Sequence, residues 1–203
     1  MRSFDGKVAL VTGAGRGIGK AVALSLAQLG CRVVLAARTS GELEKVKLDI
    51  QNDKGLAVAV PTDLTRDEDI DTLVRESERQ FGAVDFLINN AGWGKRASVV
   101  RAKIEDWDQT LRVNLRAPML LAQKLLPAMI EKGEGAVINI GSVSGKSGEA
   151  NGAAYSASKF GLIGFTQSLA WEVAKQGIRV VAIAPGLVHT PMAQKHAAKL
   201  TPE

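Results

Sequence analysis

The stretch KVALVTGAGRGIGK, residues 7–20, joins a short apolar run to a glycine-rich turn and then to a pattern of helical spacing. Residues 7–11 predict a strand, and residues 17–29 predict a helix that ends at Gly30. Glycines permit a tight turn and close backbone approach, and a helix N-terminus favours an anionic group. The turn therefore indicates a nucleotide site; a purely structural turn is the alternative.

Strand-like and helix-like patterns alternate along the rest of the chain. Further strands are predicted at residues 32–37, 56–60, 84–89, 136–141 and 178–184. Further helices are predicted at residues 39–52 and 65–81, each opened by a capping box, at 104–132 with a bend or break near Pro118, at 153–176, and as a polar stretch toward Glu203. The strands are apolar on both faces, which is typical of right-handed βαβ units. We therefore predict an α/β fold: a three-layer, doubly wound parallel sheet (Rossmann fold) of six strands in the order 3-2-1-4-5-6.

Length and composition narrow the function classes. The chain has 203 residues, so we predict that residues 1–203 form a single dinucleotide-binding and catalytic domain. With one cysteine, Cys31, no intrachain disulfide can form, and a cytoplasmic location is expected. No secretory signal or membrane span is predicted. The net charge of +5 is scattered among acids and the two histidines lack metal spacing, so neither nucleic-acid binding nor a metal site is predicted.

The end of the second predicted strand indicates the choice of cofactor. An acidic residue there would bind the ribose of NAD. This chain instead has Ala37 and Arg38, with Arg16 in the glycine turn and no acidic residue before Glu42. Because guanidinium groups form charge-assisted bonds to phosphate, we expect NADP(H) to be favoured over NAD(H). Two solvated surface arginines are the alternative.

Polar residues also follow the third and fourth predicted strands, at the edge of the sheet where a ligand should bind. Asp63, followed by Leu64, could accept a hydrogen bond from an adenine amino group, or could initiate a helix or a turn. Asn90 could be a turn residue or a bridge between strand ends. The residues alone leave both alternatives open.

Tyr155 and Lys159 stand four residues apart, with Ser142 upstream. On a helix, residues i and i+4 share a face, so the phenol and the ammonium can point into one cleft. A nearby positive charge stabilises phenolate, so we expect the pKa of Tyr155 to fall by roughly 1–3 units from about 10. The phenol could then exchange a proton near neutral pH.

With these motifs, the chain resembles the short-chain dehydrogenase/reductase family. Its local sequence is most similar to that of the 3-oxoacyl-(acyl-carrier-protein) reductases. The resemblance covers nearly the whole chain. It rests on Thr12-Gly-x-x-x-Gly-x-Gly19, Asn89-Asn-Ala-Gly92, Asn114, Ser142, Tyr155-x-x-x-Lys159 and Pro185-Gly-x-x-x-Thr190, which occur in family order and spacing.

The resemblance implies a catalytic set of Asn114, Ser142, Tyr155 and Lys159. In this set Tyr155 is the general acid of carbonyl reduction, Lys159 lowers its pKa and binds the nicotinamide ribose, and Ser142 binds the substrate carbonyl. Asn114 holds a water that links Lys159 to solvent. The predicted cofactor-binding residues are Gly13, Arg16, Gly17, Ile18, Gly19, Arg38, Asp63, Leu64, Asn90, Tyr155, Lys159, Pro185, Gly186, Val188 and Thr190.

Two features depart from the family pattern. Val181 stands where many relatives have an asparagine, a difference that we interpret as architectural. The chain also stops at Glu203, before a seventh strand and the rest of a substrate-covering helical segment. We therefore expect the sixth strand to be an exposed apolar edge, unless another chain covers it.

The sequence thus predicts an oxidoreductase that transfers hydride between NADP(H) and a carbonyl or secondary alcohol. The expected substrate is a 3-oxoacyl thioester, carried by an acyl carrier protein, or a similar small ketone. The alternative is an NADP(H)-binding protein with little turnover, because part of the substrate-covering region is absent. The small residues Ala157, Gly161 and Gly164, together with the resemblance, favour a homodimer or homotetramer.

Overall fold

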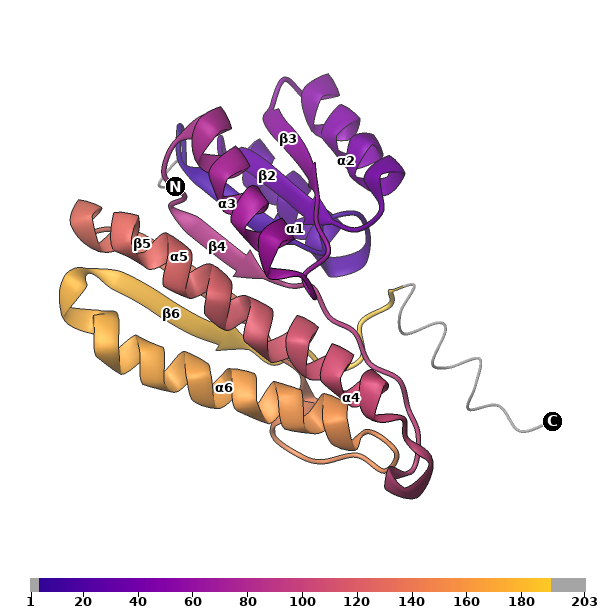
Figure 1. The fold of residues 1–203 in the computed structure, drawn as a ribbon. Helices are drawn as coiled ribbons and strands as arrows, with labels where there is room; N and C mark the ends of the chain where they lie inside the picture. Colours follow the sequence, from indigo (N-terminus) through magenta and orange to yellow (C-terminus); the bar gives the residue numbers. More distant parts are fainter. Residues whose placement is uncertain (1–3, 191–203) are drawn as a thin grey trace.

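Six parallel strands form one sheet in the order β3-β2-β1-β4-β5-β6 in the computed structural model, which describes residues 4–190 (Figure 1). The strands are β1 (Val8–Thr12), β2 (Arg32–Ala37), β3 (Leu56–Pro61), β4 (Phe86–Asn89), β5 (Gly135–Ile140) and β6 (Ile178–Ile183). The helices are α1 (Gly17–Gln28), α2 (Ser40–Asn52), α3 (Asp67–Phe81), α4 (Ile104–Leu111), α5 (Ala117–Lys132) and α6 (Ala153–Val173). The predicted α/β fold and strand order are confirmed; the helical stretch predicted toward Glu203 lies outside the described residues.

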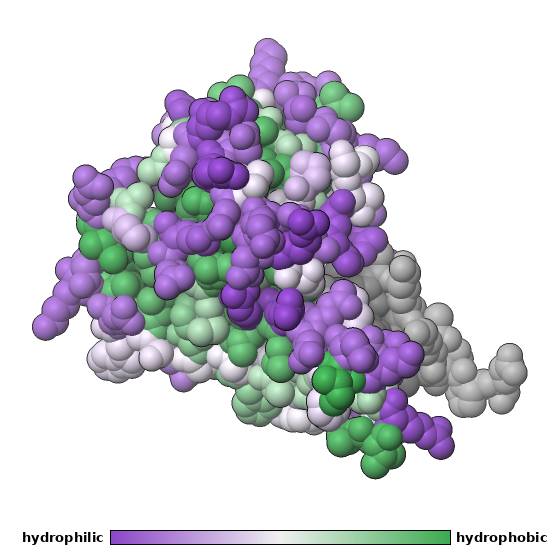
Figure 2. Space-filling model, in the orientation of Figure 1, coloured by the Kyte–Doolittle hydropathy of each residue, from purple (hydrophilic) through white to green (hydrophobic). Residues whose placement is uncertain are grey.

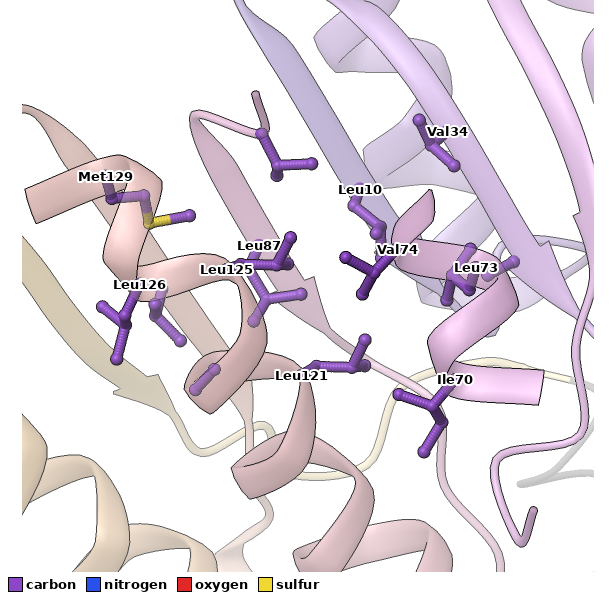
Figure 3. Packing of buried hydrophobic residues seen from close by; sticks show 14 of the residues in the cluster. Leu10, Val34, Ile70, Leu73, Val74, Leu87, Leu121, Leu125, Leu126 and Met129 are labelled. Atoms are coloured by element: carbon purple, nitrogen blue, oxygen red, sulfur yellow. The ribbon is translucent and has the colours of Figure 1, made fainter. Parts of the chain in front are cut away.

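The sheet separates two hydrophobic cores, because side chains alternate between the faces of each strand. Leu10 of β1 packs with residues of α3, α5 and α6, whereas Ala9 and Val11 pack with residues of α1 and α2. Figure 3 shows Leu10 between α3 and α5, with Leu87 of the neighbouring β4 beside it. The apolar runs of the inner strands are therefore explained by helices on both faces.

The last strand, β6, is buried on one face only. Ile178 and Val180 are buried under α6, whereas Val181 and Ile183 on the other face are 48% and 50% exposed. The expected apolar exposure at this edge of the sheet is therefore present in the described part of the chain.

The predicted helix at residues 104–132 is broken, as its proline suggested. A π-helical turn at Arg112–Arg116 separates α4 from α5, and Pro118 is the second residue after it. Proline has no N–H to donate to the carbonyl four residues earlier, so the regular α-helical ladder lacks one bond at this point. Single π turns of this kind often occur at functional sites. Here the turn contains Asn114, which is completely buried.

The two predicted capping boxes are wrong, although both helices form. Neither α2 nor α3 has a side-chain hydrogen bond at its N-cap, and α3 begins two residues later than predicted, at Asp67. The side chain of Glu42 pairs with Arg16, and Thr65 Oγ1 donates to Asp63 Oδ1 at 2.8 Å. Tertiary and loop partners at the edge of the sheet have replaced the local capping partners.

Candidate active site

A cleft of about 620 Å³ lies along the carboxyl ends of the strands. Parallel strands bring all these ends to one edge, and the sheet reverses its direction of winding between β1 and β4. The cleft is lined by every predicted cofactor-binding residue except Gly19, and by Ser142 of the predicted catalytic set. Asn114 does not line it.

The glycines of the turn allow close packing between the turn and α1. Gly13 and Gly17 have φ values of +66° and +57°, in the region that favours glycine. A Cβ atom on Gly19 would lie 2.3 Å from the Gly13 carbonyl oxygen, so only glycine lets α1 pack against the turn. Gly19 therefore shapes the nucleotide site without lining it.

The hydrogen bonds of Asn90 show whether it is a turn residue or a bridge between strand ends. Its Nδ2 atom donates to the carbonyl oxygen of Thr12 at 2.8 Å, and its backbone N–H donates to Thr12 Oγ1 at 3.0 Å. These bonds join the end of β4 to the end of β1. Asn90 is thus a bridge between strand ends that also fixes the start of the glycine-rich turn.

Four charged residues surround the end of the cleft next to β2. The arginines Arg16 and Arg38 line it, as do Glu42 and Asp63. Arg16 Nη1 lies 3.3 Å from Glu42 Oε1, in a partly exposed pair. Burial raises the pKa of Asp63, but hydrogen bonds from Thr65 and the charge of Arg38 outweigh this, so the pKa lies below its ordinary value.

Lys159 is buried at the other end of the cleft, with 3% of its surface exposed. Its Nζ atom donates a hydrogen bond to the carbonyl oxygen of Ile140 at 2.7 Å. Burial lowers the pKa of the Lys159 ammonium to about 8. The side chain can therefore change its charge close to neutral pH.

Tyr155 lies one helical turn before Lys159 and lines the same cleft. A Cβ atom on Gly94 would lie 2.8 Å from Tyr155 Cδ2, so a glycine is needed where the loop after β4 crosses the ring. The prediction of a lowered pKa is wrong for this structure: burial and the charge of Glu149 raise the pKa of Tyr155, against a hydrogen bond with Ser142 and the charge of Arg96. Lys159 does not offset this effect, because its ammonium binds the Ile140 carbonyl and lies 5.8 Å from the ring centre.

A chain of hydrogen bonds leads from Ser142 through Ser144 to Glu149 and Arg96, three residues that the sequence did not single out. Ser144 N donates to Ser142 Oγ at 3.1 Å, and Ser142 Oγ donates to Ser144 Oγ at 3.2 Å. Ser144 Oγ in turn donates to the carboxylate of Glu149, which also binds Arg96. No local sequence pattern predicts the Arg96–Glu149 pair, because the two residues are 53 residues apart and both lie in loops.

Asn114 acts behind the cleft. Its Oδ1 atom accepts a hydrogen bond from Trp93 N at 2.8 Å, and its Nδ2 atom donates to Trp93 O at 2.8 Å and to Ser158 Oγ at 3.0 Å. The side chain thus fastens the loop after β4, whose residues line the cleft, to α6. Its predicted contact with a water stays a prediction.

The segment after β6 closes the cleft on the side of β5. Val143 N donates to the carbonyl oxygen of Pro185 at 3.1 Å, which fixes this segment beside the end of β5. Pro185, Gly186, Val188 and Thr190 all line the cleft, as the sequence predicted.

Residues 4–190 contain no group of three or more His, Cys, Asp or Glu side chains arranged to bind a metal ion. Within the same range, no helix combines the length and the apolar character needed to cross a membrane.

Comparison with known proteins gives matches over most of the chain. A family model described as short chain dehydrogenase matches residues 7–201. The 3-oxoacyl-(acyl-carrier-protein) reductase FabG of Vibrio cholerae is 42% identical over 190 residues, which cover 94% of this chain and 77% of that protein. The 3-oxoacyl-(acyl-carrier-protein) reductase of Synechocystis is 39% identical over 195 residues, covering 96% and 79%.

Solved structures resemble the fold equally well. A metagenomic short-chain oxidoreductase in complex with NADP superposes with a TM-score of 0.88 at 42% identity, over 92% of this chain and 85% of that one. A variant of actinorhodin polyketide ketoreductase with NADPH gives a TM-score of 0.93 at 36% identity, over 98% and 77%.

Proposed function

The chain belongs to the short-chain dehydrogenase/reductase family, and from this we propose that it is an NADP(H)-dependent carbonyl reductase. Its proposed substrate is a 3-oxoacyl thioester carried by an acyl carrier protein, or a similar small ketone. One observation carries the proposal: Ser142, Tyr155 and Lys159 converge on a cleft that also contains the glycine-rich turn. The relatives named as 3-oxoacyl reductases support the choice of substrate.

The residues of the cleft fit a dinucleotide. Added Cβ atoms at Gly13 and Gly19 would meet backbone or Asn90 atoms at 2.9 Å or less, so the glycines let the turn pack closely at the N-terminus of α1, where a pyrophosphate is favoured. Arg16 and Arg38 would bind a 2′-phosphate, and Lys159 the nicotinamide ribose. When bound, NADP(H) supplies or accepts the hydride.

Residues of the chain then donate the proton and stabilise the negative charge on the substrate oxygen. Ser142 and Tyr155 donate hydrogen bonds to the carbonyl oxygen, where negative charge develops during reduction. Tyr155 transfers its proton to this oxygen, while Lys159, one helical turn further along α6, would bind the nicotinamide ribose. Burial raises the pKa of Tyr155, so the phenol carries the proton that reduction requires, and the same shift makes it a weaker acid.

Asn114 and Asn90 act as supports in this proposal. Asn114 keeps the Trp93 backbone, and with it one wall of the cleft, fastened to α6. Asn90 keeps the glycine-rich turn in place against β4. The alternative, a nucleotide-binding protein with little turnover, gives no task to the Ser142–Tyr155 pair.

We further propose a homo-oligomer that assembles through α5 and α6, in the cytoplasm. Figure 2 shows apolar surface on the side of the molecule formed by these helices, next to the largely polar surface over α3. Exposed apolar side chains there include Met119 and Ile130 of α5 and Phe160 and Trp171 of α6, the last 86% exposed. Burial of such side chains between subunits would be favourable.

The experiment that tests the proposal follows NADPH oxidation with β-keto esters, 3-oxoacyl thioesters and small ketones. Wild type should turn over at least one of these classes, and Tyr155→Phe should lose at least about 100-fold in kcat while it still binds NADPH. Equal activity of wild type and Tyr155→Phe would overturn the proposed mechanism. NADPH binding without turnover of any substrate would instead favour the alternative.

A further inference from the structure

The side chain of Glu42, in the first turn of α2, lies against the glycine-rich turn. A Cβ atom on Gly15 would lie 2.9 Å from Glu42 Cβ and 3.0 Å from Glu42 Oε2, so the absent side chain makes room for the carboxylate. Glu42 Oε1 lies 3.3 Å from Arg16 Nη1, and both residues line the cleft. The carboxylate therefore occupies the same end of the cleft as the arginines proposed to bind a 2′-phosphate.

An acid in the first turn of α2 suits the helix dipole, but this alone does not bring the carboxylate to the glycine-rich turn. At the N-terminus of α2, Glu42 donates its backbone N–H to the Thr39 carbonyl, but its side chain forms no capping bond. Asp63, the other acid at this end, is different: its Oδ1 atom accepts two hydrogen bonds from Thr65.

The ion pair with Glu42 also does little to hold the Arg16 side chain in one conformation. The two side chains are 60% and 36% exposed, and they share one hydrogen bond of 3.3 Å. Partly exposed pairs of this geometry contribute little to stability and hold a long side chain only loosely. Removal of the carboxylate should therefore cost little preorganisation of Arg16.

We propose that Glu42 is a specificity-determining residue that weakens the binding of the 2′-phosphate and so limits the preference for NADP(H) over NAD(H). It competes with the phosphate for the Arg16 guanidinium, and its own charge repels a group that carries nearly two negative charges at neutral pH. NAD(H) lacks this phosphate, and a carboxylate near its ribose can accept hydroxyl hydrogen bonds. The inference rests on the nucleotide site of the proposed function.

Equilibrium binding without substrate tests the inference, because it needs no turnover. The dissociation constants of NADPH and NADH are measured by nucleotide fluorescence for wild type and Glu42→Gln, a substitution that keeps the size of the side chain. We expect NADPH to bind Glu42→Gln about three- to tenfold more tightly, and NADH to change by less than about twofold. The gain for NADPH should shrink as the salt concentration rises.

Glu44→Gln is the matched control. Glu44 lies on the same helix and pairs with Lys47, away from the cleft, so its loss should leave both dissociation constants unchanged. In an Arg16→Gln background the effect of Glu42→Gln on NADPH should become smaller, because the competition for the guanidinium is gone.

Two results would overturn the inference. The first is weaker NADPH binding by Glu42→Gln, which would mean that the carboxylate preorganises Arg16. The second is an unchanged ratio of the NADPH and NADH dissociation constants. Absence of binding of either nucleotide to wild type would overturn the proposed function itself, and the inference with it.

Discussion

The Nζ atom of Lys159 lies 5.8 Å from the centre of the Tyr155 ring, and its hydrogen bond goes to a backbone carbonyl rather than to the phenol. The two residues are one helical turn apart, yet burial determines the pKa of each. The phenol is pushed toward its neutral, acidic form and the ammonium toward its neutral form. This arrangement keeps the proton on Tyr155 and makes the charged form of Lys159 costly to bury.

Replacement of Lys159 by methionine should stabilise the ligand-free protein at pH 7 while abolishing activity. Below pH 8 the folded and unfolded chains both carry the charge, and the folded chain bears the cost of burying it. Between the folded pKa of about 8 and the ordinary value of 10.5, the folded chain loses its proton first, so wild-type stability rises with pH. The substitution also leaves the Ile140 carbonyl without its donor, so we expect a net gain of about 1–2 kcal/mol at pH 7.

Denaturant unfolding of wild type and Lys159→Met at pH 7 and pH 10 measures this difference. The stability advantage of the variant should be smaller at pH 10. An advantage that grows with pH would contradict the assignment of a buried, desolvated ammonium.

Replacement of Glu149 by glutamine should move the alkaline limb of the reductive pH profile to lower pH. The charge of Glu149 raises the pKa of Tyr155, so its removal lowers that pKa. Reduction needs the protonated phenol, and activity is lost as the pH rises through the pKa of Tyr155. Arg96→Gln should move the limb in the opposite direction, since Arg96 lowers the same pKa.

The measurement is kcat/KM against pH for the three proteins, with Glu131→Gln on the exposed side of α5 as control. Shifts of both variants in the same direction would show that the substitutions act through structure rather than through charge.

Substitution of Gly19 by alanine should destabilise the protein by about 1–3 kcal/mol and weaken nucleotide binding. The new methyl group would lie 2.3 Å from the Gly13 carbonyl oxygen and 2.4 Å from Asn90 Nδ2, so the turn must move. At Gly41 in α2 an added Cβ atom meets nothing within 4 Å, and alanine there should be neutral or slightly stabilising. Thermal unfolding and NADPH titration of both variants test this; normal nucleotide binding by Gly19→Ala would refute the packing argument.

The proposed oligomer should dissociate when charge is placed on α6. Phe160→Glu combined with Trp171→Glu would put two carboxylates into the apolar contact, and burying an unpaired charge is costly. Sedimentation velocity should then show a smaller species than wild type. Leu56→Glu, at a site 57% exposed on β3 at the opposite edge of the sheet, is the control and should not change the mass. A wild-type protein that sediments as a monomer would remove the basis for this proposal.

Local patterns in the chain were enough to predict the order of strands and helices, the parallel sheet and the place of the glycine-rich turn, and the family motifs added other residues of the cleft. They succeed because strand periodicity, glycine turns and proline breaks act over a few neighbouring residues. The glycine-rich turn after Val8–Thr12 and the break before Pro118 are of this kind. A parallel sheet then carries the ends of its strands to one edge, so residues such as Ser142 and Asn90 reach the cleft.

Other features of the site depend on partners distant in the chain, and only the tertiary structure decided them. Glu42 carries the local signal of a capping residue, but folding brings Arg16 within reach of its carboxylate. Arg96 and Glu149 carry no signal at all until two loops meet beside Ser144. The pKa of Tyr155 moved opposite to the prediction, because the helical spacing indicates a neighbouring charge but not the loss of solvent around the ring. Burial and long-range pairing are properties of the assembled fold, and they determine the electrostatics of this cleft.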